Sequence, residues 1–557
     1  MGLLGVLLPI TASLASPSRT PQAEDSPPAD VALLEGLTEL HQGRFSRGQW
    51  RFRSFLEAHP ADPRGHLFLA FCEWWKLLQV GAEVPTPAME YHLEEAVRLA
   101  QAQADRAPED PEALASLGTA YIFLAQHRAA EKRFFKAASA ARRAKATLEK
   151  AALLRPDLVD SRFGLGAYNY YADKVSLLVK GLRSMLFLPG GDSEKGLLQL
   201  NEVAERGRYF RTEAHLLLAI IYQGRHEQRY RAALDHLQAA LELNPDSPIV
   251  LGSLGELQMR LGAYPESHAV LQRAIARCEV SGDREQALLG RILRILLADS
   301  LDLSLHNTEA MKEIGSALPG PALHPDWRKR LLAVATRSAL RVGDTESLEK
   351  IFAVLAVGPA ERESLLRRHG STAWINPALV RSLAPALARL EEDRAEAALP
   401  VLEALISTRP EAPELLFHRG RLAFQLGRWA EARSWLARIP DSPLRTAPWV
   451  LGWKELFIGR CGWELGEIDA AKESYRRALE VDGFRGKDLA RELLGPEGSH
   501  PHVWPREVFA SGLQPEEDPL DVAAGLLERR DAPVAVHGFL TGIVGGKRES
   551  GVAVSRK

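Results

Sequence analysis

Residues 411–440 read EAPELLFHRGRLAFQLGRWAEARSWLARIP, and six positions in this stretch have a spacing that recurs along the chain. Counted from Gly420, a second glycine stands at +7, an aromatic residue or isoleucine at +9, a small residue at +12, and apolar residues at +16 and +19. The other copies start at Gly36, Gly255 and Gly459. Fixed offsets that recur in this way indicate one supersecondary unit copied along the chain.

The offsets describe two helices joined by a tight turn. The first glycine lies within a helix, where the missing side chain lets the second helix come close. The second glycine ends that helix, because glycine tolerates a positive φ. The positions at +12, +16 and +19 fall on one face of the second helix. Proline follows several of the expected second helices, as it commonly follows helix exits, at Pro60, Pro156, Pro245, Pro410 and Pro440.

This unit resembles the tetratricopeptide repeat, a helical hairpin of about 34 residues. The resemblance covers most of residues 31–490 and is strongest at 247–280 and 411–482. It implies an all-α fold, an α-solenoid of tetratricopeptide-type helical hairpins. The fold serves as a generic binding scaffold, so it does not by itself give a function.

Two copies are less regular. One runs without glycine through Glu392, Arg394, Ala397, Val401 and Ala404. The other opens at Leu117, Gly118 and Tyr121 but closes late, at Ala151 and Pro156. The late closure predicts an insertion around residues 128–143.

We expect six segments along the chain. Residues 163–214 depart from the repeat pattern and are similar to the tetratricopeptide group that includes the mitochondrial outer-membrane inclusion-body clearance proteins and their animal relatives. Asp192 or Ser193 is the expected N-cap of a helix there. The segments are a possible signal remnant and linker (1–30), N-terminal helical repeats (31–158), an atypical helical insert (159–214), central, partly degenerate repeats (215–375), C-terminal tetratricopeptide repeats (376–494) and a largely disordered tail (495–557).

Composition excludes several classes of function. A net charge of −2 over 557 residues argues against a nucleic-acid surface, which would show as a basic stripe. The three cysteines Cys72, Cys278 and Cys461 are far apart and form no CxxC, so buried thiols are expected rather than a disulfide or metal site. Neither a catalytic motif nor a metal or cofactor motif stands out. We therefore expect a protein that is not an enzyme and carries no cofactor.

Two apolar stretches bear on location. Residues Met1–Ala15 resemble a secretory signal ending in a small-residue cleavage site, although no Lys or Arg precedes Arg19. A periplasmic or secreted protein is the expectation, with a cytoplasmic protein as the alternative. Val175–Leu188 falls short of the ~20 residues that span a bilayer. We expect a buried helix there, and an interfacial membrane helix is the alternative.

The resemblance also implies a binding face. In the tetratricopeptide family, the first helix of each repeat lines a concave groove. The positions of this chain that match its inner face are rich in aromatic residues and arginine, the types that dominate interface energetics. The candidate partner-binding residues are Phe417, Arg421, Phe424, Trp453, Arg460 and Trp463. The alternative is that these aromatic residues pack against the following helix.

Three functions remain open from the sequence. The first is a non-catalytic scaffold that binds a peptide or protein in a concave groove, with the partner contacting arginine or apolar side chains. The second is a membrane-associated structural or assembly protein. The third is an enzyme with its site in the irregular middle, around residues 168–192.

Overall fold

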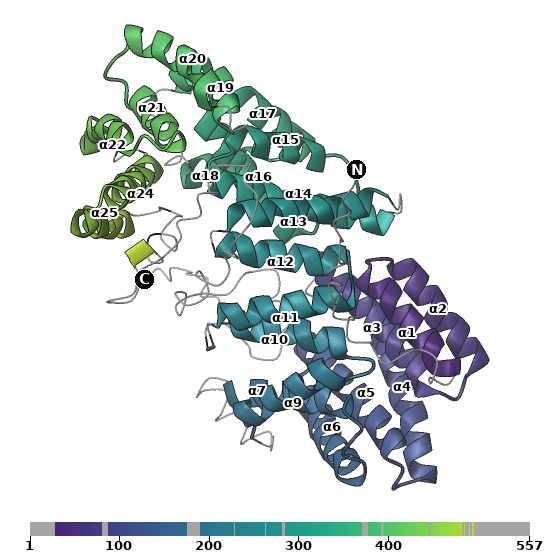
Figure 1. Ribbon diagram of the computed structural model, residues 1–557. Coiled ribbons are helices and arrows are strands. Elements are labelled where there is room, and N and C mark those ends of the chain that lie inside the picture. The colour runs from purple at the N-terminus through teal and green to yellow at the C-terminus, as the bar shows by residue number, and fades with distance from the viewer. Residues whose placement is uncertain are drawn as a thin grey trace, which may run out of the picture.

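The computed structural model is all-α, an α-solenoid, as predicted (Figure 1). Within the residues that it describes, no helix is both long enough and apolar enough to cross a membrane. The predicted signal stretch Met1–Ala15, the helix expected over Val175–Leu188 and the tail 495–557 lie outside the described residues. The structure describes residues 28–494 except 81–86, 175–189, 225, 228, 262, 281–283, 370–376, 392–394, 445–446, 482–483, 485–489 and 491–492.

The helices fall into three groups, which we call the N-terminal block, the central helices and the C-terminal block. The N-terminal block comprises α1 (Pro28–His41), α2 (Phe45–Ala58), α3 (Pro63–Val80), α4 (Pro87–Arg106), α5 (Pro111–Ala130), α6 (Phe134–Leu154), α7 (Ser161–Lys174), α9 (Ser193–Arg206), α10 (Arg211–Gln223), α11 (Tyr230–Leu243) and α12 (Pro248–Arg260). The central helices are α13 (Tyr264–Glu279), α14 (Arg284–Leu303), α15 (Asn307–Ala317), α16 (Pro325–Val342), α17 (Thr345–Val354) and α18 (Pro359–His369). The C-terminal block comprises α19 (Pro377–Glu391), α20 (Ala395–Thr408), α21 (Pro413–Gln425), α22 (Trp429–Ala437), α23 (Asp441–Leu444), α24 (Pro448–Glu464) and α25 (Ile468–Glu480).

The glycine register of the repeat is confirmed. A Cβ atom added to the first glycine of each regular copy would lie 2.3–2.6 Å from the apolar side chain sixteen residues later, so the two helices cross where no side chain fits. The pairs are Gly36 with Phe52, Gly255 with Leu271, Gly420 with Leu436, and Gly459 with Tyr475. The second glycine has a positive φ at Gly43, Gly427 and Gly466, which ends the first helix as expected.

The hairpin that was expected to carry an insertion is instead longer throughout. Helix α5 has 20 residues and α6 has 21, and only a short turn containing Lys132 separates them. Lys132 has a φ of 62°, so it takes the left-handed place that glycine has in other repeats. A Cβ on Gly118 would lie 2.5 Å from Leu148. The insertion expected around 128–143 thus takes the form of longer helices, because the extra residues extend α5 and α6 on either side of the turn.

The irregular middle contains a hairpin of the same kind. Helices α7 and α9 cross at Gly166 and Gly196, where a Cβ on Gly166 would lie 2.9 Å from the carbonyl oxygen of Gly196. Asp192 is the N-cap of α9, accepting a hydrogen bond of 3.0 Å from the backbone N–H of Lys195, as predicted. The chain between the two helices, 175–189, is outside the description.

The copy without glycine was placed one residue too early. Ala398 and Leu402 of α20 are fully buried, whereas Ala397 and Ala404 of the predicted register are exposed. Its first helix carries the buried Ala386 where other repeats have glycine. With no glycine to mark the crossing, the apolar pattern alone did not fix the register.

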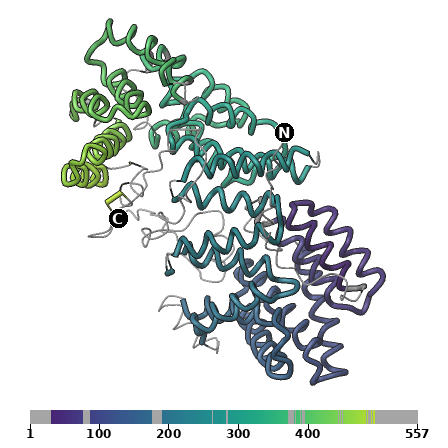
Figure 2. The backbone as a smooth tube through the Cα atoms, in the orientation of Figure 1, coloured from purple at the N-terminus to yellow at the C-terminus, as the bar shows by residue number. Residues whose placement is uncertain are grey.

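The N-terminal block closes on itself, with α1–α3 lying beside α10–α12, and it also contacts α14 of the central helices (Figures 1 and 2). His41 and Glu213 are 2.6 Å apart, and Ser247 donates a 2.5 Å hydrogen bond to the carbonyl of His41. Gln286 of α14 donates to the carbonyl oxygen of Gln42 at 2.8 Å. The block is thus joined by contacts between residues far apart in the sequence.

An aromatic cluster fills the interior of the N-terminal block. The Phe210 ring has its centroid 5.0–6.2 Å from four other rings, with either tilted, edge-on or stacked geometry. Such pairs add about 0.5–1.5 kcal/mol each beyond the area that they bury. The four rings are Phe68, Phe71, Phe123 and Phe163.

The three cysteines are buried free thiols, as expected. Burial raises the pKa of both Cys72 and Cys461 to about 12. These thiols are therefore protonated at neutral pH and unreactive.

Candidate functional site

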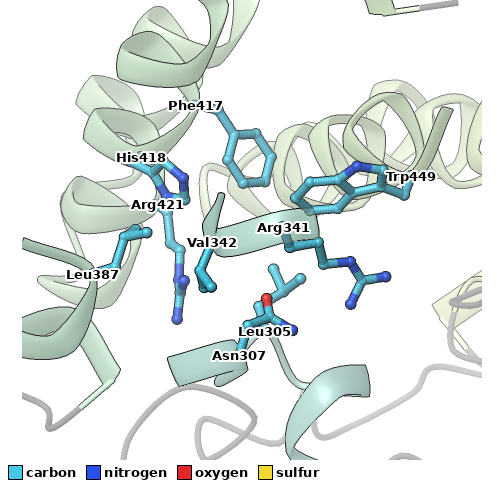
Figure 3. Close-up of a pocket in the computed structure, with 9 residues that line it drawn as sticks. All are labelled: Leu305, Asn307, Arg341, Val342, Leu387, Phe417, His418, Arg421 and Trp449. Atoms are coloured by element: carbon cyan, nitrogen blue, oxygen red, sulfur yellow. The ribbon is translucent and has the colours of Figure 1, made fainter. Parts of the chain in front are cut away.

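A pocket lies where the central helices meet the C-terminal block (Figure 3). It holds about 260 Å³ of empty space, including solvent at its mouth. Helices α16, α19, α21 and α24 all contribute to it, together with the turn between α14 and α15. The lining residues are Leu305, Asn307, Arg341, Val342, Leu387, Phe417, His418, Arg421 and Trp449.

One wall of the pocket is held by a buried ion network. The carboxylate of Asp302 on α14 is fully buried and accepts hydrogen bonds from Arg337 at 2.8 Å and Arg341 at 2.9 Å. Burial alone would lower the pKa of Arg337, but the charges of Asp302 and Asp299 outweigh it and raise that pKa. Arg341 thus enters the pocket wall as one half of a buried ion pair.

The network extends in both directions. Arg330 bonds to Asp299 at 3.1 Å and to Glu256 of α12 at 2.8 Å. At the other end the guanidinium of Arg341 lies over the ring of Trp449, 4.7 Å from its centroid, as a cation–π contact. One chain of charges therefore runs from the N-terminal block to α24 of the C-terminal block.

The opposite wall carries a second arginine beside histidines. Arg421 is 2% exposed and projects toward the pocket from α21 beside His418 (Figure 3). Burial, with the charge of Arg421, lowers the pKa of His418 well below its usual value. The same two causes, in that order, lower the pKa of His306. Both imidazoles are neutral at pH 7, and Arg421 supplies the positive charge on this side.

The structure brings three of the predicted binding residues together around one ring. Phe457 of α24 is the centre, with ring centroids 6.0 Å from Phe417, 4.8 Å from Phe424 and 5.7 Å from Trp453. All four rings are buried. Phe417 and Arg421 also line the pocket, so two of the six predicted residues belong to it.

The remaining two predicted residues lie further along α24. Arg460 is 9% exposed and pairs with Glu464 one turn later. Trp463 is only partly buried and packs against the C-terminal core. That these six residues bind a partner stays a prediction.

Sequence reasoning missed the other half of the pocket, Arg341 and Trp449. A signal was present in the run LLADSLDL of α14, where Asp299 and Asp302 interrupt an apolar stretch at a three-residue spacing. Acidic residues in a buried helix need partners, and such a run points to arginines on a neighbouring helix. Which arginines these are depends on contacts between residues 31 to 39 apart in the sequence.

Comparison with known proteins addresses the repeats directly. Residues 225–278 and 389–446 match a tetratricopeptide repeat family, and residues 456–484 match a second family of the same description. These ranges include the crossings at Gly255 and Gly420. The chain therefore carries tetratricopeptide repeats in these ranges.

One curated protein and two solved structures are similar to this chain at low sequence identity. Cellulose synthase operon protein C of Pseudomonas fluorescens is 26% identical over 292 residues, which cover 52% of this chain and 20% of that protein. The chain therefore spans about a fifth of the length of that curated relative. A tetratricopeptide repeat protein from Parabacteroides merdae is 16% identical, with 51% of this chain and 97% of that chain covered and a TM-score of 0.22. The tetratricopeptide repeat domain of P58(IPK) is 14% identical, with 78% and 96% covered and a TM-score of 0.21.

Proposed function

We propose that the protein is a non-catalytic scaffold that binds a peptide or protein segment at its C-terminal block. The observation that carries this proposal is the pocket, whose lining includes the rings of Phe417 and Trp449 and the guanidinium of Arg421. Aromatic residues and arginine are the residues that contribute most to protein interfaces. The expected partner segment presents an apolar side chain next to an acidic group.

The binding surface in this proposal extends from the pocket along α24. Arg460 and the partly buried Trp463 lie on that helix, beyond the buried ring cluster. The pocket is small, so we expect a bound partner to make further contacts along α24.

We further propose that the protein acts in a bacterial envelope, periplasmic or secreted. Two observations support this location, the signal-like stretch Met1–Ala15 and the likeness to a protein named for a cellulose synthase operon. Expression with the natural upstream sequence, followed by fractionation and N-terminal sequencing, is expected to give a mature chain that begins near Ser16. An uncleaved chain in the cytoplasm would contradict the proposed location in the envelope.

Trp463→Ala tests the binding surface. Partners are first captured on the immobilised protein and identified by mass spectrometry, and the affinity is then measured. Loss of an interface tryptophan typically costs about 2 kcal/mol, so we expect roughly thirtyfold weaker binding with little change in melting temperature. The matched control is Trp50→Ala on α2, whose side chain is 62% exposed at the other end of the chain. That variant is expected to bind as the wild type does.

Arginine supplies a second, independent pair of variants. Arg460→Gln removes a charge that pairs with Glu464 on α24, and Arg98→Gln removes one that pairs with Glu95 on α4. We expect only Arg460→Gln to weaken capture of the partner.

A large fall in the melting temperature of Trp463→Ala, with unchanged affinity for the partner, would identify Trp463 as a packing residue and remove it from the binding surface.

A further inference from the structure

Three side chains at one corner of the N-terminal block bring together metal-ligating atoms. Glu90 lies in the first turn of α4, His127 in the last turn of α5, and Glu131 directly follows α5. One ligand atom from each lies within 4.8 Å of the other two. Nε2 of His127 is 3.2 Å from Oε2 of Glu131 and 3.8 Å from Oε2 of Glu90.

His127 is buried without the hydrogen bonds that a buried imidazole normally has. Its side chain is 1% exposed, and within the described part of the chain neither ring nitrogen has a partner in hydrogen-bond geometry. Buried polar groups in folded proteins nearly always have a partner. Because Nε2 faces two carboxylates, the side chain is aimed at the place that a cation would occupy.

His127 can supply a metal ligand from the ring atom that faces the carboxylates. In the neutral tautomer with the proton on Nδ1, the lone pair of Nε2 is free to bind a metal. Histidine nitrogen and carboxylate oxygen are both ligands that zinc takes in proteins.

The distances also match. Zinc binds histidine nitrogen and carboxylate oxygen at about 2.0–2.2 Å, so neighbouring ligand atoms of a tetrahedral site lie about 3.4 Å apart. The separations of 3.2 and 3.8 Å from Nε2 bracket that value. The two carboxylates also lie within 4.8 Å of each other, so side-chain rotation can bring all three ligand atoms to one ion.

In the structure, the guanidinium of Arg133 already contacts both carboxylates. Nη2 of Arg133 donates to Oε1 of Glu90 at 2.5 Å and also contacts Glu131. Its side chain is 30% exposed, so it can turn out to solvent. Arg128, paired with Glu94, adds a second positive charge nearby.

We propose that Glu90, His127 and Glu131 form a zinc site in which the metal ion replaces the guanidinium of Arg133. Three protein ligands leave a fourth position for water or for a ligand from a partner. The ion would tie the start of α4 to the turn between α5 and α6. The sequence shows no metal motif here, because Glu90 and His127 stand on different helices and meet only after folding.

The test uses the full-length protein stripped of metal with a chelator. Zinc binding is measured by isothermal titration calorimetry, and the melting temperature is recorded with and without zinc. We expect the wild type to bind zinc and to melt at a higher temperature with it. His127→Gln is expected to weaken binding at this site tenfold or more and to remove most of the rise in melting temperature. Glu131→Gln, at a half-exposed position, repeats the test if His127→Gln destabilises the apoprotein.

Arg133→Gln separates a metal site from a simple ion cluster. Removing the competing charge is expected to tighten zinc binding about fivefold, whereas a cluster that only needs Arg133 would lose stability and gain no zinc. The histidine pair His215–His236, with Nδ1 atoms 3.0 Å apart, is another place where zinc could bind. His236→Gln is therefore the control and is expected to leave binding at the cluster unchanged. Equal zinc binding by wild type and His127→Gln, or no tightening in Arg133→Gln, would overturn the proposal.

Discussion

The N-terminal and C-terminal blocks are built from the same helical hairpin but differ in the contacts that hold the hairpins together. In the N-terminal block, α1–α3 contact α10 and α14, and Phe210 gathers four rings in the interior. In the C-terminal block, the three rings around Phe457 come from α21 and α24. The first block is held by contacts across 172 to 206 residues of sequence, from His41 to Glu213 and Ser247. The rings of the second block come from neighbouring repeats.

The difference shows what the repeat does and does not determine. Gly36 and Gly420 make the same close crossing, with Phe52 and Leu436 respectively, so the unit itself is alike in both blocks. The way successive hairpins stack then determines whether later helices contact the first helices of the block. The C-terminal block meets the central helices at a pocket lined by arginine and aromatic residues.

The largest expected effect comes from the ion network that joins the two blocks. Asp302→Ala leaves Arg337 and Arg341 buried without their shared carboxylate. Breaking a buried pair from one side typically costs about 3–5 kcal/mol. We expect a loss of this size in chemical denaturation, with increased hydrogen exchange at α14, α16 and α24. A loss under 1 kcal/mol would show that water replaces the carboxylate and that the network does not join the blocks.

A matched pair of phenylalanine variants compares the blocks directly. Phe210→Ala and Phe457→Ala each remove a buried ring at the centre of a cluster, at a typical cost of about 3–5 kcal/mol. Because each repeat of a solenoid contacts its neighbours, Phe457→Ala should increase hydrogen exchange in α21–α25 only. Phe210→Ala should increase it from α1 to α12. Identical exchange patterns would refute the contrast between the blocks.

Acid is expected to lower the stability of the contact between the central helices and the C-terminal block, because buried histidines lie there. Unfolded histidine titrates near pH 6.5, while burial lowers the pKa of His268 to about 4 and that of His306 and His418 well below the usual value. Between pH 6.5 and 4 the unfolded chain binds more protons, so stability falls as the pH falls. For His268 the shift corresponds to about 3 kcal/mol at most.

Denaturation at pH 7.5 and 5 measures this loss. His418→Gln removes one titrating group at this contact, so the difference between the two pH values should shrink. His215, whose pKa burial lowers to about 4 within the N-terminal block, gives the comparison. If His215→Gln and His418→Gln both leave the difference as it is in the wild type, carboxylates rather than histidines carry the acid sensitivity.

The smallest expected effects concern the register of single hairpins. Ala432→Leu and Ala471→Leu add bulk at buried positions beside Gly420 and Gly459, and overpacking of this kind costs about 1–3 kcal/mol. Thermal melting checks this. In α20, Ala398→Leu should have a similar cost, whereas Ala397→Leu at the exposed neighbour should stay within about 0.5 kcal/mol. If Ala397→Leu lowered stability more than Ala398→Leu, the register predicted from the sequence would be the correct one.

The sequence predicted the hairpins because glycine spacing is a local property. Gly255 with Leu271, or Gly459 with Tyr475, can be paired by counting residues. Where glycine is missing, as at Ala386, the count slipped by one residue, and at Gly118 the long helices hid the partner Leu148. These errors are small because each hairpin contains its own register.

The candidate site was only partly predictable, because it is not local. The sequence placed Phe417 and Arg421 on one face of a helix, and both line the pocket. Arg341 and Trp449 reach the same pocket from other helices, and their meeting depends on how the central helices stack against the C-terminal block. Repeat spacing carries no information about that stacking.

The closure of the N-terminal block also has a consequence for folding during synthesis, because the contacting residues are made at different times. His41 is synthesised 172 residues before its partner Glu213, and Gln42 is synthesised 244 residues before Gln286. At about 5–20 residues per second, helices α1–α3 leave the ribosome roughly ten seconds to one minute before the surface that covers them exists. During that interval the apolar side of α3, including Phe68 and Phe71, faces solvent or a chaperone. At the C-terminal end the wait is shorter, because Phe417 is synthesised only 40 residues (457 − 417) before its partner Phe457.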